Sequence, residues 1–263
     1  MGQLRSTTPD WDGCVKTDHL RHIREYWNGE ASDYANAHPE HLDETCHPSW
    51  GLFNIPEHDI RILVEDLAPG DRVLDLGCGR GQDAVGYAEM GMDVTAIDIS
   101  DGQLANAIAH ERVTYVHSSA EKVPVPSGHF EAVFSDHGAF DHSPARPLLD
   151  EVHRVLKPNG VLAICTYTPL AICCYDSGKG RIGEQLQRRY PDDDIKFNGK
   201  ITAVERSYAG WITAFLATGF EIVGLEELKV RPESRPFFSD LISTEWASKW
   251  PCDLIWKVRR CAP

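Results

Sequence analysis

A glycine-rich turn between two apolar runs is the feature of this sequence with the clearest chemical meaning. Residues 73–100 read VLDLGCGRGQDAVGYAEMGMDVTAIDIS, and three glycines follow Asp75. These are Gly77, Gly79 and Gly81. Glycine lets a ligand approach the backbone, and a helix that begins there offers unpaired N–H groups. Asp98 ends the next apolar run, 21 residues after the first glycine, where a carboxylate can accept both hydroxyls of a ribose. The pattern therefore predicts an adenosine-binding site.

Two classes of cofactor carry such an adenosine. A dinucleotide site prefers G-x-G-x-x-G, whereas the third glycine here comes one residue earlier and residue 82 is Gln. Asp75 and Asp83 flank the turn, and carboxylates repel a pyrophosphate but attract an ammonium or sulfonium group. The turn therefore favours S-adenosylmethionine over NAD, and an NAD-dependent oxidoreductase remains the alternative.

The elements expected around the turn alternate between strands and helices. Strands are expected at 72–76, 94–98, 113–117, 130–135, 161–166, 220–225 and 254–258. Helices are expected at 81–90, 144–156 and 201–218. Two further helices are indicated by apolar residues at helical spacing: Leu20, Ile23 and Trp27 in the first, and Ile60, Leu63, Val64 and Leu67 in the second. Strands that alternate with helices form a parallel sheet covered on both faces, so the pattern predicts an α/β fold.

Three segments carry a family resemblance: VLDLGCGRG, AIDIS and LLDEVHRVLKPNGVLAI. They resemble motifs of the class I S-adenosylmethionine-dependent methyltransferases, in the type 11 group that includes quinone-biosynthesis and natural-product enzymes. The resemblance implies a Rossmann-like, doubly wound sheet of seven mostly parallel strands with an antiparallel last strand. It also implies a helical N-terminal cap at 1–59 and a methyltransferase domain at 60–263. Within that domain, lid insertions are expected at about 167–200, after the fifth strand, and at 229–250.

The resemblance also implies which residues would contact the cofactor. They are Tyr34, Asp75, Gly77, Cys78, Gly79, Asp98, Ile99, Ser119, Ala120, Glu121 and Ser135. Asp98 would hold the ribose and Ile99 would pack on the adenine. The family commonly has an Asp-Ala pair near the adenine amine, and here Ser119 replaces the Asp, which leaves the backbone of Ala120 as the expected contact.

A second polar cluster, SDHGAFDHS at 135–143, follows the predicted strand at 130–135. Methyl transfer is an in-line displacement at an activated sulfonium, so positioning supplies most of the catalysis. A base is needed only where the acceptor atom carries a proton. His137 is the first candidate for this base and His142 the second, with Asp136 beside them. The spacing matches no familiar metal site, so no metal is predicted.

Aromatic residues gather in the segments expected to cover the acceptor. His47, Trp50 and Tyr167 are the candidate lid residues. Such side chains favour a small, apolar or aromatic acceptor, methylated on O, N or C. A protein that uses this fold to bind the cofactor without transferring a methyl group is the further alternative.

Composition and charge narrow the choice of partners. The 263 residues are 42% hydrophobic and 25% charged, which is typical of a globular protein. Lys and Arg number 26 and Asp and Glu 40, a net charge of −14 that disfavours nucleic acid and anionic membranes. The eight cysteines include no C-x-x-C pair, so reduced thiols and a cytoplasmic location are expected. The sequence shows no signal peptide or membrane span, and a monomer or homodimer is expected.

Overall fold

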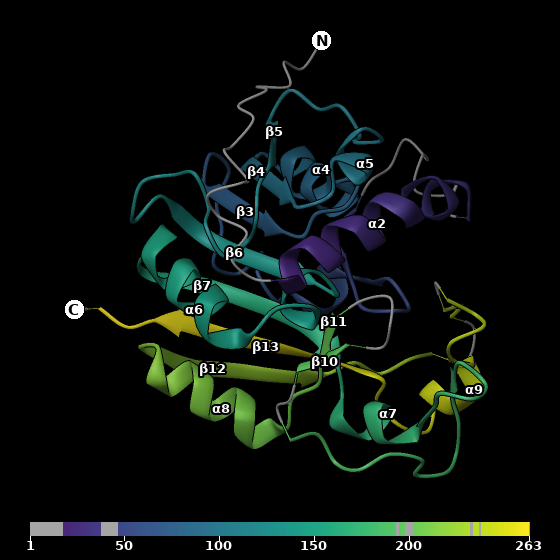
Figure 1. The fold of residues 1–263 in the computed structure, drawn as a ribbon. Coiled ribbons are helices and arrows are strands. Elements are labelled where there is room, and N and C mark those ends of the chain that lie inside the picture. Colours follow the sequence, from purple (N-terminus) through teal and green to yellow (C-terminus); the bar gives the residue numbers. More distant parts are fainter. Residues whose placement is uncertain are drawn as a thin grey trace.

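The centre of the molecule is a sheet of seven strands (Figure 1). The computed structural model describes residues 18–37, 47–192, 195–197, 202–231, 234–236 and 238–262. The strands of the sheet are β3 (Arg72–Leu76), β4 (Asp93–Asp98), β5 (Val113–His117), β6 (Phe130–Asp136), β7 (Leu156–Tyr167), β12 (Phe220–Glu227) and β13 (Asp253–Arg260). Their order is β12-β13-β7-β6-β3-β4-β5, and β13 runs antiparallel to both of its neighbours. The predicted fold class is confirmed.

The strand order places a crevice beside β3. The chain moves outward from β3 to β4 and β5, and then returns to pair β6 with the other side of β3. The helices that follow β3 and β6 therefore leave the sheet in different directions, which is where open α/β sheets bind ligands. Asp98 and Asp136 end β4 and β6, so the strand ends bring both carboxylates to this edge.

Helices cover both faces of the sheet. They are α4 (Gln82–Glu89), α5 (Asp101–Leu104), α6 (Ala145–Val155) and α8 (Tyr208–Ala217). Apolar side chains of α6 and α8 pack into one core cluster, and those of α4 into another. Successive residues of β6, Val133 and Phe134, belong to these two different clusters, as the alternation of a strand requires. The core therefore fixes β3 and β6 from both sides.

The helix predicted at 201–218 is wrong over its first residues. Strand β11 (Thr202–Val204) pairs there with β10 (Ile195–Phe197), and α8 begins only after Ser207. The Ser207 hydroxyl accepts the N–H of Gly210 at 2.9 Å, so a capping serine inside the predicted range starts the helix.

The helix predicted from the stripe of Ile60 and its neighbours is also too long. Helix α3 (Glu57–Ile60) ends at Arg61, whose φ is +54°. The Glu57 carboxylate then accepts the N–H groups of Leu63 at 2.6 Å and Val64 at 2.9 Å, in place of helical carbonyls. Leu63 is nevertheless fully buried, so the apolar stripe marks core residues without a continuous helix.

The remaining elements lie around the crevice. Helix α2 (Asp18–Ala37) packs against α5, and the Asn28 side chain accepts from the Ser100 hydroxyl at 2.6 Å and donates to Asp101 at 2.8 Å. The other elements are β1 (Ser49–Trp50), β2 (Ile55–Pro56), η2 (Ala139–Asp141), α7 (Pro169–Cys174), β8 (Tyr175–Asp176), β9 (Arg181–Ile182) and α9 (Thr244–Ala247). The division of the chain at residue 59 stays a prediction. None of the helices in the described ranges combines the length and hydrophobicity that crossing a bilayer requires.

Candidate functional site

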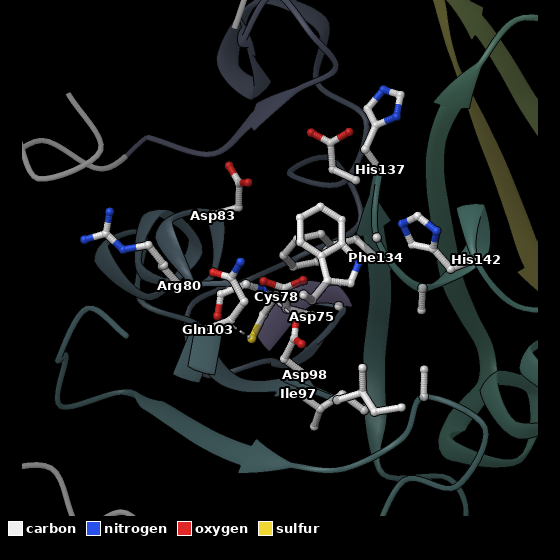
Figure 2. Close-up of a pocket in the computed structure, with 18 of the residues that line it drawn as sticks. Asp75, Cys78, Arg80, Asp83, Ile97, Asp98, Gln103, Phe134, His137 and His142 are labelled. Carbon is white, nitrogen blue, oxygen red and sulfur yellow. Dashed lines mark hydrogen bonds between the residues drawn. The ribbon is translucent and has the colours of Figure 1, made fainter. Parts of the chain in front are cut away.

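A cavity opens at the carboxyl ends of β3, β4 and β6, and residues of α2 and of the segment 51–54 also line it (Figure 2). Many of the predicted site residues line this cavity. They are Asp75, Gly77, Cys78, Gly79, Asp98, Ile99, Ser119, Ala120, Asp136, His137 and His142. The strand ends therefore bring together the glycine turn, the ribose candidate and the polar cluster after β6.

Glycine is required in the turn for two different reasons. Gly77 and Gly79 have φ of +81° and +54°. A Cβ atom on Gly77 would lie 2.7 Å from the backbone N of Ala139, so the protein itself excludes a side chain there. A Cβ on Gly79 would meet no atom of the described residues within 4 Å, and Gly79 lines the cavity. At Gly79, a ligand rather than the protein is what a side chain would obstruct.

Asp98 holds the turn and still has room to bind. One carboxylate oxygen accepts the N–H of Gly79 at 2.8 Å and the other that of Ser100 at 2.8 Å. Burial raises the pKa of Asp98, while these two hydrogen bonds oppose that rise. Each oxygen keeps a second lone pair, so the carboxylate can accept two further hydroxyl groups from the cavity.

Three other carboxylates line the cavity, and one of them, Asp136, has a charged neighbour: burial raises the pKa of Asp136, and the ring of His137 opposes that rise. Among the residues that the structure describes, no Lys, Arg or His nitrogen lies within ion-pair distance of Asp75, Asp83 or Asp136. Burial raises the pKa of Asp75 well above its usual range, and the charges of Asp83, Asp98 and Asp136 add to the effect. Burial, and then Asp136, raises the pKa of Asp83 to about 7. The cavity is therefore prepared for a cationic ligand, which would relieve this repulsion.

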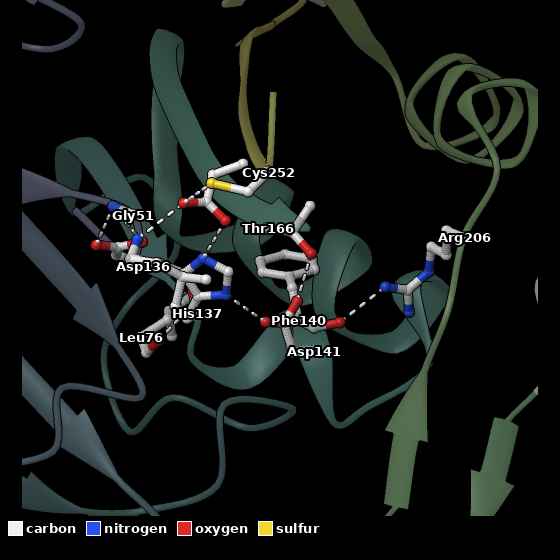
Figure 3. A network of polar contacts seen from close by, with 12 residues as sticks. Gly51, Leu76, Asp136, His137, Phe140, Asp141, Thr166, Arg206 and Cys252 are labelled. Atoms are coloured by element: carbon white, nitrogen blue, oxygen red, sulfur yellow. Dashed lines mark hydrogen bonds and ion pairs between the residues drawn. The ribbon is translucent and has the colours of Figure 1, made fainter. Parts of the chain in front are cut away.

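His137 is held between two carboxylates (Figure 3). Its Nδ1 lies 3.0 Å from Asp141 Oδ2 and its Nε2 lies 3.2 Å from Asp253 Oδ1. Burial alone would lower the pKa of His137, but Asp253 and Asp141 raise it well above its usual range. Carboxylates that face both ring nitrogens favour the imidazolium form, in which each nitrogen donates a hydrogen bond. A general base needs a nitrogen lone pair, which this geometry does not offer at His137.

His142 also lines the cavity, five residues further on. Its ring centroid lies 5.7 Å from that of Trp27 in an edge-to-face arrangement. The loop before it is held by Arg206, whose guanidinium donates to the carbonyls of Phe140 at 2.8 Å and Ser143 at 2.7 Å (Figure 3). His142 therefore has a fixed backbone and a side chain at the cavity wall.

Two of the predicted cofactor contacts, Ser135 and Glu121, are not among the residues that line the cavity. Ser135 donates its hydroxyl to the Leu76 carbonyl at 2.8 Å and so ties β6 to β3. Glu121 faces His19, with 3.0 Å between Oε1 and Nε2. Tyr34 falls in α2, and its side chain lies outside the described residues. Ser135 and Glu121 thus connect elements around the site.

The three predicted lid residues also lie outside the lining of the cavity. Trp50 is 1% exposed and lies in the core, because its indole N–H donates to the buried Glu57 carboxylate at 2.5 Å. His47 is exposed, with its ring centroid 6.4 Å from that of His58. Tyr167 packs its ring 4.5 Å from that of His137, behind the cavity wall. None of these side chains faces the cavity.

Several lining residues were not predicted for the site. They include Leu20, Ile23 and Trp27 of α2, Leu52, Asn54, Asp83, Gln103, Phe134 and Phe238. The α2 residues carried a signal, the apolar stripe, but nothing local shows what that stripe covers. Gln103 is 3% exposed, and its Oε1 has no hydrogen-bond partner among the described residues, so a ligand hydroxyl or amine could satisfy it.

Residues 49–52, here called the cap segment, contribute Gly51 and Leu52 to one wall of the cavity. Three carboxylates from different elements accept its backbone N–H groups. The pairs are Ser49 with Asp83 at 3.0 Å, Gly51 with Asp136 at 3.0 Å, and Leu52 with Asp253 at 2.8 Å. The carboxylates thus fix the cap segment to α4, β6 and β13.

Gly51→Ala is expected to destabilise the protein. Gly51 has φ of +71°, and a Cβ there would lie 2.7 Å from Asp253 Oδ2 and 2.8 Å from Leu228 Cδ1. The clash adds to a backbone cost of about 1–2 kcal/mol. Denaturant unfolding measures the loss, and Gly70→Ala is the control, since Gly70 also has positive φ but meets nothing within 4 Å. Equal losses for the two variants would contradict the close approach.

Asp136, His137 and Cys165 place one donor atom each within 4.8 Å of one another. Both nitrogens of His137 already face carboxylates, and burial raises the pKa of the Cys165 thiol well above its usual range. Thiolate and neutral imidazole are the forms that bind metals, so these residues fit a metal ion poorly.

The comparisons with known proteins agree with this geometry. Residues 74–164 match the family model of the methyltransferase domain. An uncharacterized methyltransferase of Synechocystis sp. is 39% identical over 109 residues, which are 40% of this chain and 51% of that protein. The chain spans about half the length of the curated relatives it matches. The match confirms the resemblance seen in the motifs: residues 74–164 are similar to the methyltransferase domain.

Solved structures share the fold over most of the chain. The geranyl diphosphate C-methyltransferase of Streptomyces coelicolor, in complex with Mg²⁺, geranyl diphosphate and S-adenosylhomocysteine, has a TM-score of 0.64 at 16% identity. The alignment covers 93% of this chain and 98% of that one. The [4+2]-cyclase SpnF has a TM-score of 0.63 at 18% identity, and the alignment covers 91% of this chain and 96% of that one. At these identities the likeness concerns the fold.

Proposed function

We propose that the protein is an S-adenosylmethionine-dependent methyltransferase that acts on a small molecule. The observation that carries the proposal is the cavity itself. It combines a glycine turn open at Gly79, a ribose acceptor at Asp98 and carboxylates without cationic partners at Asp75 and Asp83. The ribose of S-adenosylmethionine matches the acceptor at Asp98. Its sulfonium and ammonium groups match the carboxylates of Asp75 and Asp83. A pyrophosphate would meet the carboxylates instead, and this disfavours the dinucleotide alternative.

The proposed cofactor contacts follow from the lining. Asp98 accepts the ribose hydroxyls and Asp75 attracts the charged methionine part. Ile99, Ser119 and Ala120 lie on the side of β4 and β5, where the adenine would stack and its amine would meet backbone groups. Gln103 is added to this set, because its buried Oε1 lacks a partner in the described residues. In the bound state the cofactor supplies an already activated methyl group, so the chain's main task is positioning.

The acceptor is proposed to be apolar or aromatic. Leu20, Ile23 and Trp27 of α2 line the cavity together with Phe134 and Phe238. These side chains would exclude water and pack against an apolar acceptor.

We assign the base, where the acceptor carries a proton, to His142 in place of His137. His142 lines the cavity, whereas His137 donates both ring N–H groups to Asp141 and Asp253. His142→Gln is expected to lower kcat at least tenfold on an O–H or N–H acceptor and to leave S-adenosylhomocysteine binding unchanged. Steady-state kinetics and calorimetry measure the two effects. Unchanged kcat would remove His142 from this role.

A transfer assay tests the proposed function. The protein is incubated with methyl-labelled S-adenosylmethionine and a panel of phenols, quinols, isoprenoids and arylalkylamines, and S-adenosylhomocysteine release is measured. We expect label in at least one acceptor, and none with Asp98→Ala. Cofactor binding without any transfer would favour the non-methylating alternative. Binding of NADH in place of S-adenosylmethionine would favour the oxidoreductase.

The affinity for S-adenosylmethionine is expected to fall below about pH 7. The pKa of Asp83 is raised to about 7 in the ligand-free cavity, and a bound cation favours the carboxylate form. Binding at pH 6 must therefore release a proton, and affinity falls by up to about tenfold per pH unit for this one group. Calorimetry at pH 6 and 8, in buffers of different ionisation enthalpy, measures both effects. Asp83→Asn should flatten the dependence, and an affinity that rises toward pH 6 would contradict the assignment.

A further inference from the structure

We propose that His137 is a positioning residue that acts through Asp253 to hold the cap segment across the acceptor end of the cavity. The proposal begins with the backbone of His137, whose φ is +44°. This left-handed conformation is disfavoured for a residue with a side chain. It is maintained where surrounding contacts fix the side chain, and here both ring nitrogens face carboxylates.

The two carboxylates connect the ring to different parts of the fold. Asp141 uses Oδ2 for His137 at 3.0 Å and Oδ1 for the Thr166 hydroxyl at 2.5 Å. Asp253 uses Oδ1 for His137 at 3.2 Å and Oδ2 for the Leu52 N–H at 2.8 Å. The ring therefore bridges η2 to Asp253, the first residue of β13. Asp253 in turn holds the cap segment through its hydrogen bond with the Leu52 N–H.

Asp136, next to His137 in the chain, makes a second connection to the cap segment. Asp136 accepts the N–H of Gly51 at 3.0 Å, so consecutive amides of the cap segment end on Asp136 and Asp253. Gly51, Leu52, Asp136 and His137 all line the cavity. These four residues thus form one wall, and Figure 2 shows His137 at the end of the cavity away from the ribose candidate Asp98.

The positive charge of the ring is what makes the arrangement stable. The groups that face His137 are the carboxylates of Asp136, Asp141 and Asp253, the thiol of Cys165 and the ring of Tyr167. Asp253 is 1% exposed. Without the imidazolium, these carboxylates would repel one another in a buried space, and Asp253 would move away from its neighbours. Such a movement weakens its bond to the Leu52 N–H.

Amide hydrogen exchange tests the proposal on the ligand-free protein. In His137→Gln, the Gly51 and Leu52 amides are expected to exchange at least tenfold faster, while amides of β3 keep their rates. His153→Gln, on α6 with its ring against Phe220, is the matched control and should change neither set. A purely structural role for His137 would accelerate core and cap amides together, which would overturn the proposal.

A double-mutant cycle tests the route through Asp253. Asp253→Asn alone should accelerate the Leu52 amide, and adding His137→Gln should produce little further change, because both substitutions interrupt one path. Additive effects would overturn this route. The pH profile supplies an independent readout: His137 has a raised pKa, so the wild-type protection of Leu52 should persist near neutrality and decline at alkaline pH as the ring loses its proton. His137→Gln should lack that decline, after correction for intrinsic exchange.

This inference rests on the proposed function only because one end of the cavity is taken to bind the methyl acceptor. Exchange is measured without cofactor, so a failure of S-adenosylmethionine to bind would leave the cap result intact. With an acceptor in hand, His137→Gln should raise its KM at least fivefold and change the KM of S-adenosylmethionine less than twofold. The reverse split would contradict a role at the acceptor end.

Discussion

Gly79→Ala is expected to weaken S-adenosylhomocysteine binding at least tenfold while the protein stays folded. A tenfold loss corresponds to about 1.4 kcal/mol. The Cβ atom would meet no protein atom within 4 Å, so it would project into the cavity without a clash in the protein. Its cost to folding is the positive φ of +54°, about 1–2 kcal/mol for alanine. Calorimetric titration measures the affinity, and denaturant unfolding measures the stability.

Gly128→Ala separates the two effects. Gly128 has φ of +64° and also meets nothing within 4 Å, so it carries the same backbone cost as Gly79. Gly128 is not among the residues that line the cavity. The control variant should therefore lose similar stability and keep full affinity. Equal affinities in the two variants would show that no ligand passes close to Gly79.

Asp98→Ala is the second substitution with a large expected effect. The carboxylate is proposed to accept the ribose hydroxyls, and hydrogen bonds to a charged group contribute about 1.5–3 kcal/mol each. The substitution also removes the acceptor of the Gly79 N–H, which holds the turn at 2.8 Å. Affinity for S-adenosylhomocysteine should therefore fall at least tenfold. Isothermal calorimetry measures the change.

Two further variants make the Asp98 result specific. Asp98→Asn keeps the shape and one acceptor oxygen, so it should fold at least as well as Asp98→Ala and bind with intermediate affinity. Asp93→Asn lies at the other end of β4, where the exposed carboxylate pairs with Arg112 at 2.8 Å. It should leave affinity unchanged. Unaltered binding in Asp98→Ala would remove Asp98 from the site.

The sequence indicated most of the sheet and its order of strands and helices. Strands such as β3 and β6 are buried on both faces, so their apolar runs are visible without knowledge of the partners. Helix ends were harder to predict where side chains, rather than helical carbonyl groups, accept the backbone N–H groups. Glu57 accepts the N–H groups of Leu63 and Val64 and ends α3 early, which no periodicity shows.

The side of the cavity formed by the glycine turn was predictable, and the side formed by the cap segment was not. Asp75, Gly79 and Asp98 follow from a local pattern, because the turn and the two strand ends are set within about thirty residues. The bond from Leu52 to Asp253 joins residues 201 positions apart, and that from His137 to Asp253 joins residues 116 apart. The sequence placed His137 at the correct strand end, but only distant partners determine its charge.

A crystal structure of the complex with S-adenosylhomocysteine tests the central claim most directly. The predicted result is density along the turn between Leu76 and Gly81, with the sugar hydroxyls on the Asp98 carboxylate and the amino group near Asp75. The sulfur would then point toward the wall formed by residues 49–52 and His137. An empty cavity at saturating ligand, or an adenosine placed away from Asp98, would contradict the account.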